Sequence, residues 1–230
     1  MRAYDKNKPL IFIHIPKCAG TSIDRLLMKW FGEKYSRHGF NRESPNYRTT
    51  PYKTNPGICI GGHFNRLNGE GVKDLYPGVD QFITFLRDPF EIALSNYFFW
   101  KGKRREILIR QGLMKEGDKD DFKNINDYFL KRKVSFILDF MPVPVTLDNY
   151  QETLENYFVY VGIVEDLQTS ADILADKLGF TRENIQCLNK FVRDETVSRE
   201  VKEEYVYNNR LQYHFYNYVR CKYNQLTGDK

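Results

Sequence analysis

The stretch "IFIHIPKCAGTS", residues Ile11–Ser22, changes from the pattern of a buried strand to that of a helix start. Its first part is short, apolar and rich in β-branched residues, which is typical of a strand inside a sheet. A tight turn that contains Gly20 follows, and we expect a helix over Thr21–Phe31. This arrangement predicts an anion site, because the backbone N–H groups of the turn and the helix N-terminus attract negative charge.

The position of the lysine separates this loop from the loop that binds nucleotide triphosphates. That motif, G-x-x-x-x-G-K-[ST], places its lysine directly after the second glycine. Here Lys17 precedes Gly20 by three positions, and it has no glycine four or five residues upstream. Lys17 therefore supplies its charge at the loop entrance, whereas Thr21 and Ser22 offer hydroxyls at the first helical turn. An ordinary strand-to-helix turn with a surface lysine is the alternative.

Apolar segments elsewhere in the chain predict the rest of the sheet. We expect strands at Pro9–Ile15, Gln81–Arg87 and Phe158–Glu165, and a weaker fourth at Gly57–His63. Helical segments lie between these strands, which favours parallel pairing and an α/β sheet with helices on both faces.

Capping residues place the other helices. We expect helices from Asp88 and Pro89 to about Trp100, over Leu167–Leu178, and from about Ser198 onward. An N-cap followed by proline opens the first of these, and a glycine closes the second. The stretch Gly32–Pro56 is polar and rich in Pro, Asn, Ser and Thr, so we expect a loop there.

The composition is that of one soluble globular domain. The chain has 230 residues, which we assign to a single domain over residues 1–230; 41% are hydrophobic and 28% are charged. A net charge of +5 suits an anionic ligand but is too small and too dispersed to indicate nucleic acid.

With no apolar run of about 18 residues and no signal peptide, we expect a cytoplasmic protein without a membrane span. Four scattered cysteines predict reduced thiols and no zinc site.

The segment "FITFLRDPFEIALSNY" supplies a second candidate anion site. Arg87 ends the predicted strand, and Ser95 lies seven residues after the Asp88 cap, which is about two helical turns. Both side chains are therefore expected to face the same side, where an arginine and a hydroxyl hold one phosphate. For Ser95 alone, a surface serine on a capped helix is the alternative.

Together the two motifs resemble the sulfotransferases that use 3′-phosphoadenosine 5′-phosphosulfate (PAPS). "IPKCAGTS" is similar to that family's 5′-phosphosulfate loop, P-K-[TS]-[AG]-[GS]-[TS]. "FLRDPFEIALSNY" is similar to its 3′-phosphate motif, an arginine followed eight positions on by a serine. "GGHF" and "VGIVEDLQTSADILADKLGF" are similar to the carbohydrate branch, which contains the heparan 2-O and galactose 3-O enzymes and bacterial relatives. The resemblance covers about Pro9–Phe180 and implies a P-loop NTPase-like three-layer fold with a mainly parallel sheet.

The resemblance also implies roles for individual residues. PAPS is the expected donor, its bisphosphate product PAP is released, and the acceptor is a hydroxyl on a glycan or small molecule. The implied donor-binding residues are Lys17, Cys18, Ala19, Gly20, Thr21, Ser22, Arg87 and Ser95. Lys17 is expected to contact the oxygen between sulfur and the 5′-phosphate, where it offsets charge as the bond breaks. Cys18 stands where Thr or Ser is usual, and a thiol is a weaker donor, but the other loop contacts are mostly made by the backbone.

An acceptor hydroxyl needs a base, and His63 is the candidate because imidazole titrates near neutrality. It follows a short apolar strand and two glycines, and the resemblance places the base of the carbohydrate enzymes after this strand. His14 is the rival, but its place within a buried strand predicts a hydrogen-bonded core histidine. Arg193, in "NKFVRDET", is a further candidate for the 3′-phosphate, with an ion pair to Asp194 or Glu195 as the alternative.

These observations predict in-line sulfuryl transfer from PAPS to a hydroxyl, with protein cations in place of a metal. A small-molecule or nucleoside kinase is the first rival, but it requires magnesium and a loop lysine beside the helix start. A non-catalytic module that binds a nucleotide or glycan is the second rival. It would keep Lys17 and Arg87 but place no base near the sulfuryl group.

Overall fold

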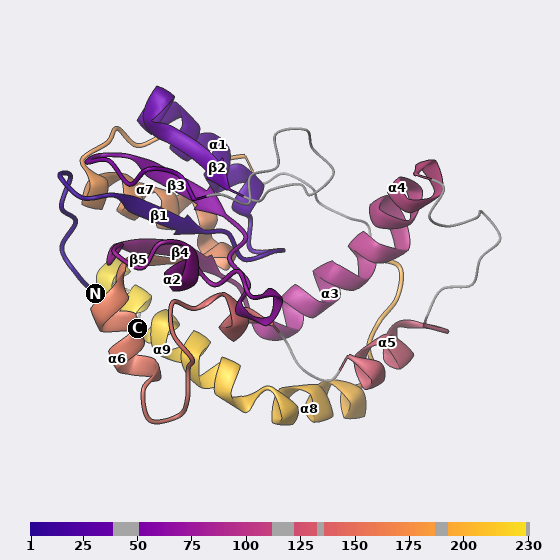
Figure 1. Cartoon of the computed structure of the whole chain (residues 1–230). Helices are drawn as coiled ribbons and strands as arrows, with labels where there is room; N and C mark the ends of the chain where they lie inside the picture. The colour runs from indigo at the N-terminus through magenta and orange to yellow at the C-terminus, as the bar shows by residue number, and fades with distance from the viewer. Residues whose placement is uncertain (39–50, 112–121, 133–135, 187–192, 229–230) are drawn as a thin grey trace.

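A parallel sheet of five strands lies at the centre of the computed structural model, which describes residues 1–38, 51–111, 122–132, 136–186 and 193–228 (Figure 1). The strands are β1 (Leu10–Ile13), β2 (Tyr35–His38), β3 (Cys59–Gly62), β4 (Phe82–Leu86) and β5 (Phe158–Ile163). Their order in the sheet is β2-β3-β1-β4-β5, and all neighbours are parallel. The expected α/β fold class with a central parallel sheet is confirmed, and all four predicted strands are present.

Helices lie around this sheet in the described part of the chain. The α-helices are α1 (Gly20–Phe31), α2 (Val72–Leu75), α3 (Pro89–Phe99), α4 (Arg105–Arg110), α5 (Ile125–Lys131), α6 (Tyr150–Tyr157), α7 (Leu167–Leu178), α8 (Arg199–Asn208) and α9 (Arg210–Thr227). Short 3₁₀ turns occupy Gly32–Lys34, Arg66–Asn68, Ile137–Phe140 and Val164–Asp166, and a π-helix occupies Trp100–Arg104. None of the described helices is both long and apolar enough to cross a bilayer.

The two faces of the sheet bury separate apolar clusters. Because side chains alternate along a strand, neighbouring residues of β1 enter opposite clusters. Phe12 packs with α1 and α7 on one face, whereas Ile11 and Ile13 pack with α6 and α9 on the other. Strands buried on both faces have nearly continuous apolar sequences, which is why β1, β4 and β5 could be recognised. The result is three layers, with the sheet in the middle (Figure 1).

The edge strand β2 was not predicted, because the sequence indicated a loop over Gly32–Pro56. Tyr35–His38 pairs with β3, and His38 is the one residue of this strand whose side chain is buried. A short polar edge strand of this kind lacks the alternating apolar pattern that identifies strands in a sequence. Residues 39–50 of the expected loop lie outside the described residues.

The C-terminal helix also differs from expectation, because it is interrupted. The predicted helix start near Ser198 is confirmed: Ser198 is the N-cap of α8, and its Oγ accepts a hydrogen bond from Val201 N at 3.4 Å. Asn209 then separates α8 from α9 and adopts φ −108° and ψ 18°. Its side-chain amide donates to the Tyr205 carbonyl at 2.8 Å, which supports the interruption without a glycine or proline.

Helix α3 extends from the carboxyl edge of the sheet toward α4 (Figure 1). As predicted, Asp88 caps it, because its carboxylate accepts from Phe90 N at 2.9 Å and Glu91 N at 3.1 Å. A third apolar cluster packs α3 against α5 and α8, and includes Phe90, Phe98 and Tyr128. This cluster anchors α3 away from the main core, so both ends of the helix are held in place.

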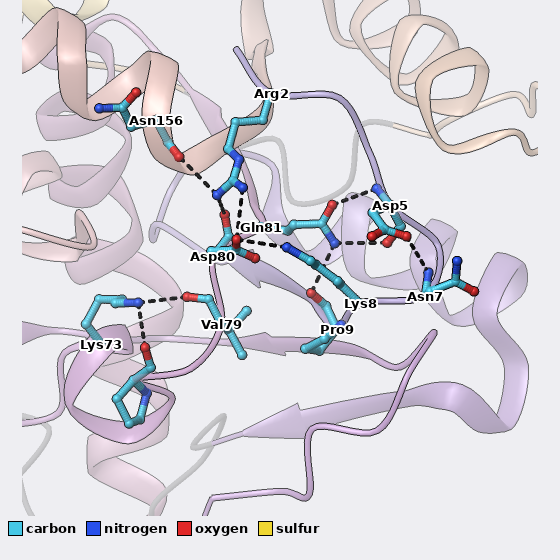
Figure 2. Close-up of polar contacts among 11 residues, drawn as sticks. Arg2, Asp5, Asn7, Lys8, Pro9, Lys73, Val79, Asp80, Gln81 and Asn156 are labelled. Atoms are coloured by element: carbon cyan, nitrogen blue, oxygen red, sulfur yellow. Dashed lines mark hydrogen bonds and ion pairs between the residues drawn. The ribbon is translucent and has the colours of Figure 1, made fainter.

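The amino end of the sheet is fastened by the segment before β1 (Figure 2). Gln81, which is 1% exposed, accepts from Asp5 N at 2.7 Å and donates to Asp5 O at 3.0 Å and Pro9 O at 3.4 Å. Arg2 donates to Asp80 O at 2.8 Å and pairs with the Asp80 carboxylate at 2.9 Å. These contacts lie at the edge of the sheet opposite the strand ends that carry the sequence motifs.

Replacing Gln81 by leucine is expected to lower the free energy of unfolding by about 1–3 kcal/mol, because buried backbone groups lose their partners. The change should leave donor affinity intact, since Gln81 lies at the opposite edge. Lys8→Ala is the matched control. It removes an exposed pair with Asp80, and such pairs contribute about 0–1 kcal/mol. Denaturant unfolding of both variants measures the difference, and equal stabilities would contradict a structural role for Gln81.

Candidate active site

Three neighbouring strands bring the sequence motifs together. β3, β1 and β4 lie side by side and parallel, so their carboxyl ends share one edge of the sheet. His63 follows β3 directly, the loop before Gly20 follows β1, and Arg87 follows β4. The carboxyl edge of an open α/β sheet is the usual place for a ligand site. Candidates that are distant in sequence therefore converge at this edge.

The loop after β1 has an unusual backbone. Lys17 has φ 68° and Ala19 has φ 55°, and these are the positive-φ residues other than glycine in the described chain. Non-glycine residues adopt this region rarely, and strained residues of this kind cluster at active sites and ligand-binding loops. The turn delivers the chain to Gly20 at the N-terminus of α1. The first N–H groups of a helix have no intrahelical acceptor, so this end suits an anion.

Gly20 is required by the close approach of His14. A Cβ atom added at Gly20 would lie 1.9 Å from His14 Nε2, and the ring belongs to a residue that is only 6% exposed. Any larger residue would therefore push the loop away from the strand. The glycine of the motif serves packing between the loop and the histidine.

The remaining loop side chains point in different directions. The Cys18 side chain is buried in the core, and burial raises the pKa of its thiol. The Ser22 hydroxyl donates to the Gln186 carbonyl at 2.6 Å, which ties α1 to the later segment. Thr21 is exposed at the first turn. Contacts of Cys18 with an anion would therefore come from its backbone, and Thr21 has the more accessible of the two hydroxyls.

His63 lies against His14 in a geometry that fixes its tautomer. Its Nδ1 is 2.7 Å from the His14 carbonyl oxygen, and the two rings have centroids 4.2 Å apart. A carbonyl oxygen only accepts, so Nδ1 carries the proton and Nε2 carries the lone pair. Burial lowers the pKa of His63, although the hydrogen bond to His14 acts in the opposite direction. The imidazole is thereby held neutral and able to accept a proton at Nε2.

His14 is buried at 6% exposure, as expected for a histidine within a central strand. Burial holds the pKa of His14 well below its usual range, and Coulomb interactions with the neighbouring His63 and Arg37 oppose its protonation further. Its ring lies close to Gly20 and also to the His63 ring. His14 thus connects the anion loop to the candidate base.

At the second candidate anion site, one acidic residue forms ion pairs with two arginines. Glu91 pairs with Arg87 at 3.1 Å and with Arg193 at 2.8 Å. Arg193 therefore lies beside Arg87 although the two are far apart in the sequence. Ser95 is four residues after Glu91, so both lie on one face of α3. Arg87 and Arg193 therefore meet at Glu91 in the first turn of α3, and Ser95 lies one turn further along the same face.

The alternative for Arg193 is an ion pair with Asp194 or Glu195, but Arg193 pairs with Glu91, and the two acidic residues have other partners. Lys101 contacts Asp194 at 3.2 Å and Glu195 at 2.7 Å, and Tyr97 Oη donates to Glu195 at 2.8 Å. The other carboxylate oxygen of Glu195 accepts from Ile125 N at 3.1 Å. These contacts hold the residues after Arg193 along α3, so its guanidinium is presented to Glu91.

Two residues of this edge were missed by the sequence analysis. Glu91 joins the arginines, and Phe99 lies under Lys17, whose Nζ is 4.1 Å from the ring centroid. Both are spaced by four residues from Ser95, one before and one after it. That spacing is the sequence feature by which they could have been found, because residues four apart share a helix face.

A comparison with protein families agrees with the resemblance of the sequence motifs and covers nearly the whole chain. The model of the "Sulfotransferase family" matches residues 3–222. A search of curated proteins found no match. The family match includes the three strand ends and the late segment that carries Arg193. The chain belongs to the sulfotransferase family.

Proposed function

We propose that the chain transfers a sulfuryl group from PAPS to a hydroxyl group of a carbohydrate, as a single domain over residues 1–230. The observation that carries the proposal is the pairing of two cationic sites with one neutral histidine at the ends of adjacent strands. Lys17 belongs to the first site, Arg87 and Arg193 belong to the second, and His63 stands at the third strand. A donor with phosphates at both ends of a nucleoside fits two such sites.

The donor would be held mainly through its phosphates. The loop Lys17–Ser22 and the N-terminus of α1 face the 5′-phosphosulfate, and Arg87, Arg193 and Ser95 face the 3′-phosphate. Guanidinium groups suit phosphate because they present several N–H donors in a fixed plane. Glu91 would hold both guanidinium groups ready for that contact.

The chemical step assigns one role to His63 and another to Lys17. His63 Nε2 accepts the proton of the acceptor hydroxyl while its oxygen forms a bond to sulfur. The bond between sulfur and the bridging oxygen breaks, and Lys17 stabilises the negative charge that remains on the 5′-phosphate of PAP. The tautomer of His63 supports this division, because its protonated Nδ1 is directed at the His14 carbonyl.

The class of acceptor, a carbohydrate, is the most specific part of the proposal. It rests on the likeness of "GGHF" and of the segment around α7 to the carbohydrate branch of the family. A screen of glycans and small hydroxyl compounds with labelled PAPS tests it. Transfer to small phenols but to no glycan would reject the carbohydrate acceptor while leaving the donor assignment in place.

PAP is expected to stabilise the protein much more than ATP or AMP does. A ligand at 100 times its Kd raises the free energy of unfolding by about 2.7 kcal/mol, and only PAP carries both phosphates at the required positions. Thermal melting with each nucleotide measures the difference. Equal stabilisation by PAP and ATP would exclude the PAPS assignment and favour a kinase.

Arg87→Ala tests the 3′-phosphate site in the same assay. In this variant, most of the thermal stabilisation by PAP should be lost. The loss is expected because truncating one partner of a desolvated charge pair costs roughly 2–5 kcal/mol. Arg182→Ala is the matched control, since Arg182 pairs with Asp176 in an exposed position beyond α7. PAP should stabilise this control as it does the wild type.

A further inference from the structure

The catalytic lysine of the proposed reaction is directed at an aromatic ring. Lys17 has φ 68°, and its Nζ lies 4.1 Å from the centroid of Phe99. A cation within about 6 Å of a ring centroid is attracted by the negative face of the ring. The backbone conformation of the loop and the ring of α3 therefore together determine where the ammonium group lies.

Phe99 stands on a firmly held part of α3. Its neighbours Tyr97 and Phe98 are 6% and 5% exposed and pack in the cluster that joins α3 to α5 and α8. The Tyr97 hydroxyl also donates a hydrogen bond to Glu195 at 2.8 Å. Successive residues of a helix point about 100° apart, so these two neighbours face the cluster while Phe99 is turned toward the loop. The ring is thus carried by a helix that packs firmly against α5 and α8.

The same helix face also carries the contacts of the other phosphate site. Glu91, Ser95 and Phe99 follow one another at four-residue spacing, and the first of them joins Arg87 to Arg193. Eight residues of helix span about 12 Å. One helix therefore connects the cations of the 3′-phosphate site to the lysine at the leaving group.

We propose that Phe99 is a positioning residue for Lys17, which its ring holds at the leaving-group oxygen; this inference rests on the proposed function. An aromatic ring suits this role better than a carboxylate does. A carboxylate would orient the ammonium group but would also cancel its charge, whereas a ring attracts the cation and carries no net charge. Lys17 then keeps its full charge for the oxygen that becomes negative as the sulfur–oxygen bond breaks.

Phe99→Leu is expected to lower kcat by about 3- to 30-fold, the range that corresponds to the loss of one cation–π contact. PAP affinity should stay within about twofold, because Lys17 acts mainly in the transition state. Phe99→Tyr should restore most of the turnover, since it retains the ring. Phe99→Met serves as a second variant if the leucine protein melts early.

A double-mutant cycle separates positioning from packing. In the Lys17→Ala background, Phe99→Leu should cause no further loss of kcat, because the ring acts through the missing ammonium group. Phe98→Leu is the matched control: it removes core packing from the neighbouring position, so any loss should be the same in both backgrounds.

The outcomes distinguish this inference from the proposed function. Independent losses from Lys17→Ala and Phe99→Leu would overturn the inference alone. An impaired Lys17→Ala protein beside a Phe99→Leu protein with full turnover would also overturn only the inference. Full turnover in Lys17→Ala would overturn the proposed role of the lysine and the inference with it.

Discussion

Lys17→Ala should lower kcat by about 10²–10³-fold, the usual loss when one group that stabilises developing charge is removed. Lys17 belongs to the loop that follows β1, and its ammonium group lies over the ring of Phe99. Charge on the bridging oxygen appears only as its bond to sulfur breaks, so the loss should fall on kcat far more than on PAP affinity. Steady-state kinetics with labelled PAPS and titration with PAP measure the two effects separately.

Lys73→Ala is the matched control for this prediction. The Lys73 ammonium donates to Pro77 O at 2.7 Å and Val79 O at 2.9 Å, at the opposite edge of the sheet (Figure 2). Its removal changes the same charge without touching the site, so kcat should remain at the wild-type value. A Lys17→Ala protein with normal kcat and weakened PAP binding would instead place the lysine on the bound phosphate and not on the leaving group.

The sheet could be predicted where burial dominates the sequence. The segments of β1 and β4 are apolar on both faces, because helices cover both sides of the central strands. β2 could not be found in this way, since Tyr35–His38 is a polar edge strand whose pairing with β3 depends on long-range contacts. The interruption at Asn209 has the same origin, because a buried asparagine and its hydrogen bond to Tyr205 leave no local mark such as glycine or proline.

The candidate site was predictable only as separate pieces. The residue types of Lys17, Arg87 and His63 and their positions after strands identify them, and the strand order brings them to one edge. Contacts between elements could not be predicted, because they depend on how α3 lies against the loop and the late segment. Glu91 illustrates this. Its ion pair with Arg87 joins residues four apart in the sequence, but its ion pair with Arg193 joins two distant parts of the chain.

The roles assigned to Lys17, Arg87, Arg193, Ser95 and His63 remain predictions. The geometry adds a reason to test the histidine first. A hydrogen bond of 2.7 Å from Nδ1 to the His14 carbonyl sets the tautomer before any substrate arrives. A base whose lone pair is already in place avoids the cost of reorientation during the reaction.

His63→Ala is expected to lower kcat/KM by about 10²–10⁴-fold, the usual span for the loss of a general base. PAP affinity should barely change, because the imidazole would face the acceptor and not the nucleotide. The pH profile should also report this residue. Protonated imidazole accepts no proton, so wild-type kcat/KM should fall as the pH drops through the pKa of His63. Burial lowers that pKa, so the acidic limb should lie below pH 6.5.

The acidic limb should be absent from the residual activity of His63→Ala. His214→Ala is the matched control, since His214 is exposed on α9 and should leave both rate and pH profile unchanged. Thermal melting must first show that His63→Ala is folded, because the lost contact with the His14 carbonyl also removes packing at the loop. A folded His63→Ala protein that transfers sulfuryl groups at a near-normal rate would exclude the residue as base. If the pH profile of His63→Ala kept the acidic limb of the wild type, the titrating group would be His14. Burial also lowers the pKa of His14.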